Sequence, residues 1–145
     1  METIRKFLRL PIAERHQLLE IAILLILVSW SLRVFSFQKV SRSLKALVTT
    51  GPLFVPADHM RSDRIAWAVG AASARIPFAA CLSSALVLQA LLERSGQPAR
   101  VCFGVSKDLT EQLSAHAWVE DNRAVPVGRG RRGSFVPLVR FSDTH

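Results

Sequence analysis

An uninterrupted apolar run near the start of the chain sets the strongest limit on how the chain can fold. Residues 21–32 read IAILLILVSWSL, and the charged residues Glu20 and Arg33 end the run after 12 residues. A helix that crosses a bilayer needs about 20 apolar residues. The 20 residues before the run are also unlike the short charged lead of a signal peptide. We therefore predict a packed helix in a cytoplasmic protein, with association of this helix with a membrane as the alternative.

Helical periodicity continues on both sides of this run. Beyond Arg33, apolar residues recur at spacings of three and four with basic residues between them, which is typical of an amphipathic helix. The sequence TTGP at residues 49–52 combines glycine and proline and predicts a break. We expect an N-terminal hydrophobic helical segment over residues 1–50 and a second segment, the folded core, over residues 51–145.

Composition excludes several classes of protein. Half of the 145 residues are apolar and only 21% are charged, which excludes a disordered chain. Two cysteines exclude a disulfide scaffold. The spacing of cysteine and histidine matches no zinc motif, so we expect no metal and no cofactor.

The net charge of +8 predicts an acidic partner surface, which could be an anionic membrane or a nucleic acid. The arginine-rich loop at residues 128–133 has no interleaved aromatic residues, so we expect no nucleic-acid partner. Its letters, GRGRRG, also fit a dinucleotide-binding pattern, but no helix start follows them. We therefore interpret this loop as a solvated basic loop.

The order of elements in the second half indicates the fold class. Helical patterns cover residues 62–75 and Cys81–Arg94, and Gly96 is a suitable terminator for the second helix. Strand patterns follow at residues 100–105, 114–120 and 134–141. A two-residue turn is predicted at Asp121-Asn122, with a return strand at 123–127. Helices followed by strands predict an α+β fold rather than a parallel βαβ sheet.

Two residues in this half could carry chemistry. Cys81 falls at the predicted start of a helix, where unpaired backbone N–H groups and the helix dipole favour a thiolate. A thiolate attacks acyl groups, and the same N–H groups can stabilise an oxyanion. His116 lies in a strand between two small alanines, which leave its imidazole accessible. Either residue alone is more often a structural core residue, and Cys102 is expected to be buried and inert.

The motifs around these residues resemble a known family. The sequences RIP at 75–77, CLSSALVLQALLERSGQPAR at 81–100 and AHAWVE at 115–120 are similar to the transglutaminase-like maturation proteases of lasso-peptide gene clusters. Those proteases are related to the C-terminal domain of the microcin J processing protein. The resemblance implies a papain/transglutaminase-like core, in which the helix bearing the nucleophile packs on a small antiparallel sheet.

The resemblance also implies an activity and partners. Such proteins are cysteine peptidases that remove the leader from a ribosomally made precursor peptide. Cys81 would be the nucleophile and His116 the general base. A separate leader-binding protein would present the precursor, and an ATP-dependent cyclase would then close the lasso ring.

The third member of a catalytic triad is the point where this chain departs from the family. The two-residue turn would place Val127 and Gly128 opposite His116, and neither can orient an imidazole. Glu120, on the same strand face as His116, and Asp121 are the remaining acids nearby. A catalytically weak or silent peptide-binding scaffold is therefore the alternative function. An amidase or acyltransferase acting on a small substrate is a third reading.

Overall fold

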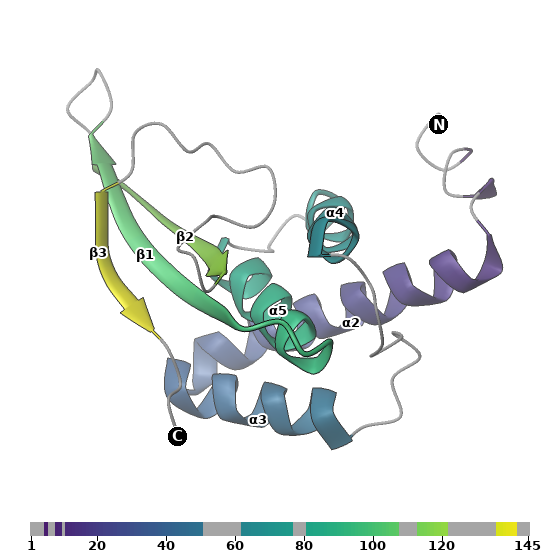
Figure 1. The fold of residues 1–145 in the computed structure, drawn as a ribbon, viewed down its shortest axis with the longest axis horizontal. Coiled ribbons are helices and arrows are strands. Elements are labelled where there is room, and N and C mark those ends of the chain that lie inside the picture. Colours follow the sequence, from purple (N-terminus) through teal and green to yellow (C-terminus); the bar gives the residue numbers. More distant parts are fainter. Residues whose placement is uncertain are drawn as a thin grey trace.

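The chain folds into a group of helices packed against one face of a small antiparallel sheet (Figure 1). The computed structural model describes residues 5, 8–9, 11–50, 62–76, 81–107, 113–121 and 136–141. The elements are α2 (Ile12–Val34), α3 (Phe37–Thr50), α4 (Ser62–Ser73), α5 (Cys81–Arg94), β1 (Ala99–Lys107), β2 (Leu113–Asp121) and β3 (Val136–Phe141). The predicted α+β class is confirmed.

The N-terminal helical region divides into two helices at Phe35, whose backbone is extended (φ −113°, ψ 157°). In α3 the buried residues Val40, Leu44 and Val48 recur every four positions, as expected for an amphipathic helix. The helix α2 carries apolar residues on all of its sides. By length and composition alone, its stretch Glu14–Val34 could cross a membrane. The 12-residue run by itself predicted an apolar helix too short to cross a membrane. In the structure the helix extends beyond the run on both sides, so the qualifying stretch has 21 residues.

The boundaries of α5 agree with the sequence prediction. Its residues are buried over nearly its whole length, from Ser83 to Leu92. Gly96 has a φ of 80°, the left-handed conformation that ends a helix with least strain in glycine. The preceding helix, α4, ends at Ser73, two residues earlier than expected, and turn hydrogen bonds continue to Ile76.

The sheet has three strands in the order β2-β1-β3, and both pairings are antiparallel. The three strands predicted at residues 100–105, 114–120 and 134–141 are all present, each within two residues of its expected bounds. The return strand expected at 123–127 and the loop at 128–133 lie outside the described residues.

A central helix organises the core. The helix α5 packs against α2, α3 and α4 as well as against β1 and β2. Buried side chains from all of these elements form one hydrophobic cluster. Residues of both predicted segments, 1–50 and 51–145, contribute to this cluster, and the division between the two segments stays a prediction.

Candidate active site

The predicted nucleophile, Cys81, is the first residue of α5, and it is exposed. The backbone N–H groups of a helix's first turn have no partner within the helix. A thiol at this position is therefore close to hydrogen-bond donors that can hold a negatively charged oxygen. Cys102 differs, because it is buried within β1 with no exposed surface. The two cysteines therefore differ in their access to solvent and reagents, as expected.

Two hydrogen bonds to neighbouring elements fix α5. Near its start, the Ser83 hydroxyl accepts a hydrogen bond from the Ser29 hydroxyl of α2 at 2.9 Å. Further along, the Gln89 side-chain amide donates to the backbone carbonyl of Ala99 at 3.2 Å, where β1 begins. Gln89 is thus a buried amide with a hydrogen-bond partner, as the sequence predicted. The first bond joins the end of α5 that carries the thiol to α2, and the second joins the middle of α5 to the sheet.

The predicted base, His116, lies in β2 directly opposite Gly104 of β1. Because glycine has no side chain, the position across the strand leaves room for the imidazole. His116 is half-buried, and its ring stacks on Trp118 with the ring centroids 6.3 Å apart and the planes at 21°. The sequence did not predict that Gly104 pairs with His116. It predicted Val127 and Gly128 opposite His116, and both lie outside the described residues.

Glu120 fixes the position of the tryptophan that contacts the histidine. The Trp118 indole N–H donates to Glu120 Oε1 at 3.0 Å, and the Glu120 residue is only 6% exposed. Because His116, Trp118 and Glu120 alternate along β2, they share one face of the strand. The sequence placed Glu120 on this face but missed its bond to Trp118, which the spacing of two residues could have indicated.

The other candidate acid, Asp121, is the last residue of β2 and pairs with Ala99. The sequence placed it in a two-residue turn, which was wrong because β2 continues one residue further. Glu120 lies on the face of β2 that carries His116, so it is the acid that the structure places on the side of the imidazole.

The structure brings the two predicted catalytic elements together, since α5 packs against β2. Ala117 and Val119, which alternate with His116, belong to the hydrophobic cluster that α5 also joins. The imidazole therefore projects from the face of β2 opposite to this cluster, so the packing of α5 on β2 does not by itself bring the imidazole to the Cys81 thiol. Among the described residues, no hydrogen bond joins the Cys81 sulfur to His116. Catalytic hydrogen bonds are often long before substrate binds, and the dyad stays a prediction.

The described part of the chain contains no group of three histidine, cysteine or acidic residues that could hold a metal ion. His59, which the sequence offers as a further imidazole, lies outside the described residues.

Comparison with known families agrees with this arrangement. A family model described as the transglutaminase-like superfamily matches residues 24–140, which is most of the chain. The match begins within α2, includes α3, α4, α5, β1 and β2, and ends one residue before the end of β3. No curated protein and no solved structure matches the chain. Members of the matched superfamily are usually cysteine peptidases or transglutaminases. A thiol at the start of a central helix packed on an antiparallel sheet, together with this match, shows that the chain belongs to the transglutaminase-like superfamily.

Proposed function

We propose that the protein is a cysteine peptidase that removes the leader from a ribosomally made precursor peptide during lasso-peptide maturation. The observation that carries this proposal is the exposed Cys81 thiol at the first residue of α5, the central helix of a chain that belongs to the transglutaminase-like superfamily. Membership of the transglutaminase-like superfamily supports a thiol acyl-transfer reaction. The motif HAWVE at residues 116–120 supports the narrower assignment to leader removal.

The proposed reaction uses covalent catalysis. Substrate binding brings the His116 imidazole to the Cys81 thiol, and His116 then removes the thiol proton so that the sulfur attacks the scissile carbonyl carbon. The N–H groups of the first turn of α5 stabilise the negative charge that develops on the carbonyl oxygen. His116 then returns its proton to the leaving amine, which is the new N-terminus of the core peptide. Water hydrolyses the thioester, releasing the leader as a carboxylic acid and restoring the thiol.

Trp118 and Glu120 act in this proposal as positioning residues. Stacking on the indole restricts the imidazole, and the hydrogen bond to Glu120 restricts the indole. An orienting group raises the rate without taking part in bond making. Glu120 thus takes the place of the acid that the family commonly supplies from the following strand.

The partners in this proposal follow from the chemistry of the substrate. A leader-binding protein presents the precursor, and the ATP-dependent cyclase consumes the new amino terminus by joining it to an acidic side chain. We place the reaction in the cytoplasm, where the precursor is made.

Selective alkylation tests whether the Cys81 thiol is suited to this role. The folded protein is treated with iodoacetamide at neutral pH, and the modified cysteines are identified by mass spectrometry. Cys102 serves as an internal control, because it has no exposed surface. We expect rapid modification of Cys81 alone, faster than that of a free cysteine in a peptide. A rate no faster than that of the peptide would argue against an activated thiol.

Cleavage of the precursor tests the activity itself. The assay combines the full chain, the precursor peptide and the leader-binding protein, and follows leader release by mass spectrometry. Cys81→Ala should lower the rate by roughly 10⁴-fold or more, as for other covalent nucleophiles. Trp67→Phe, at an exposed position on α4, is the control and should cleave at the original rate. Undiminished cleavage by Cys81→Ala would end the assignment.

A peptide-binding scaffold without activity is the second candidate function. The described structure favours it in one respect, because the thiol and the imidazole are not hydrogen-bonded to each other. A scaffold would bind the leader with the same affinity in the original protein and in Cys81→Ala, and neither protein would release the leader. Fluorescence anisotropy with a labelled leader peptide measures this affinity.

A further inference from the structure

The helix α2 carries apolar residues on the side that faces away from the core. One side of it, including Leu18, Ile21 and Leu25, is buried. Successive residues of a helix advance by about 100°, so positions three and four apart form one stripe. The exposed apolar stripe consists of Ile12, Leu19, Ile23, Ile26, Leu27, Trp30 and Val34. A helix that is apolar on all sides is found where both sides meet an apolar environment.

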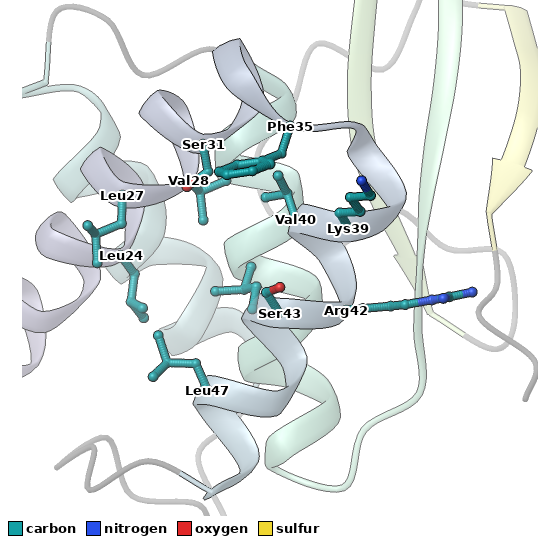
Figure 2. Close-up of a pocket in the computed structure, with 11 residues that line it drawn as sticks. Leu24, Leu27, Val28, Ser31, Phe35, Lys39, Val40, Arg42, Ser43 and Leu47 are labelled. Carbon is teal, nitrogen blue, oxygen red and sulfur yellow. The ribbon is translucent and has the colours of Figure 1, made fainter.

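This stripe continues into a groove between α2 and α3 (Figure 2). The groove encloses about 570 Å³, and its lining is mostly apolar. Leu27, Phe35 and Leu47 line it and are each about half exposed, so they connect the groove with the surface of the helix. Exposed apolar surfaces of this extent mark sites of interaction.

The charged residues on the part of α2 beyond Glu20 and on α3 are all basic. No acidic residue occurs between Glu20 and Asp58 in the sequence. Lys39 and Arg42 line the groove, and Figure 2 shows the Arg42 side chain extending away from its apolar centre. Arg33 lies over the ring of Trp30, with its guanidinium carbon 5.3 Å from the ring centroid. The apolar surface is therefore bordered by cations and a tryptophan.

We propose that α2 and α3 form a surface that binds an anionic lipid bilayer, with α2 lying in the plane of the membrane. Basic side chains around an apolar face are the pattern of helices that bind membrane surfaces. Arginine and lysine complement the phosphates of anionic lipids, and tryptophan prefers the depth of the headgroups. This charge complementarity selects a bilayer over an uncharged apolar partner.

The contacts of α2 with the core decide between lying on the membrane and spanning it. Ser29 is hydrogen-bonded to Ser83 of α5, and Arg64 of α4 forms an ion pair with Glu14 at 2.6 Å. Leu25 has no exposed surface. A spanning α2 would break these contacts and expose the side chains of the cluster, whereas an interfacial α2 keeps them and uses only its outer stripe.

Vesicle co-sedimentation of the full chain tests the proposal. Vesicles of phosphatidylcholine mixed with phosphatidylglycerol are compared with vesicles of phosphatidylcholine alone. We expect binding to the anionic vesicles that falls several-fold in about 1 M salt, where the Debye length is about 3 Å. Equal binding to both kinds of vesicle, or to neither, would overturn the proposal. Self-association in sedimentation without lipid binding would instead assign the groove to a second copy of the chain.

Two tryptophans of nearly equal exposure provide matched variants. Trp30 on α2 is 57% exposed and Trp67 on α4 is 54% exposed. We expect Trp30→Glu to weaken vesicle binding by about tenfold or more, because it places a carboxylate at an apolar, anionic interface. Trp67→Glu should leave binding unchanged. Equal effects of the two substitutions would contradict the assignment to α2.

Conservative variants keep the test independent of folding. Brominated lipids quench tryptophans that enter the bilayer, so Trp30→Phe should lose most of the quenching and Trp67→Phe should retain it. Alkaline carbonate should release the bound protein, and resistance to carbonate would show a spanning helix and refute the interfacial placement. Lipid binding and peptide cleavage are measured separately, so either can fail without the other.

Discussion

The hydrogen bond between Ser29 and Ser83 tests how firmly the N-terminal helix belongs to the core. The Ser29 hydroxyl of α2 donates to the Ser83 hydroxyl of α5 at 2.9 Å. The two residues are 8% and 1% exposed. Ser83 is two residues from Cys81, so this bond also connects α2 to the end of the helix that carries the thiol.

The expected energies follow from this burial. Ser29→Ala or Ser83→Ala leaves the other hydroxyl buried without its partner, which costs about 1–3 kcal/mol. A serine in a helix can turn to the carbonyl four residues earlier, so we expect a value of about 1–2 kcal/mol for each variant. The double variant places two methyl groups face to face and should be nearly as stable as the original protein. The coupling energy, which is the loss in the double variant minus the two single losses, is therefore expected to have a magnitude of about 2 kcal/mol or more.

Urea denaturation measures the free energy of unfolding of four full-length proteins: the original protein, the two single variants and the double variant. In a separate thermal unfolding experiment, a change of 1 kcal/mol should shift the Tm by about 2–4 °C for a chain near this size. Ser73→Ala on α4 is the control, because the exposed Ser73 hydroxyl bonds only to the carbonyl of its own helix, at Gly70. Its effect should stay within about 0.5 kcal/mol. Additive losses in the double variant, or single losses as small as that of the control, would refute the reasoning.

Three further substitutions test separate parts of the fold. Gly96→Ala should lower the free energy of unfolding by about 1 kcal/mol, because an alanine is strained at a φ of 80°. Among the described residues nothing lies within 4 Å of the added methyl group, so no clash adds to this cost. A loss near zero in urea denaturation would show that the turn adjusts. Glu120→Ala should cost about 1–3 kcal/mol by leaving the Trp118 indole N–H unpaired, and Glu120→Gln, which keeps an acceptor, should cost less; the reverse order would contradict the assigned bond. Lys45→Ala should cost at most about 1 kcal/mol, since its ion pair with Glu93 at 3.2 Å is partly exposed. In urea denaturation, high salt should reduce the difference in unfolding free energy between this variant and the original protein. A difference that salt does not change would show that Lys45 contributes by packing and not by its charge.

The sequence determined the elements whose signals are local. The helix Cys81–Arg94 follows from apolar periodicity, and its end follows from Gly96, whose left-handed backbone the structure confirms. The three strands and the α+β class follow from alternation and from the order of the elements. The position of Cys81 at a helix start also needed no tertiary information, whereas its exposure became known only from the structure. These features depend on residues within one or two turns of each other, so a pattern in a short window is sufficient to predict them.

Only the tertiary structure decided which distant residues meet. The position of His116 opposite Gly104 depends on strand register, which follows from the packing of the whole sheet face rather than from either strand alone. The bond between Ser29 and Ser83 joins residues 54 positions apart. Which side of α2 remains exposed was likewise unreadable from an apolar sequence, because a helix that is apolar all round presents no pattern until its neighbours cover one side of it.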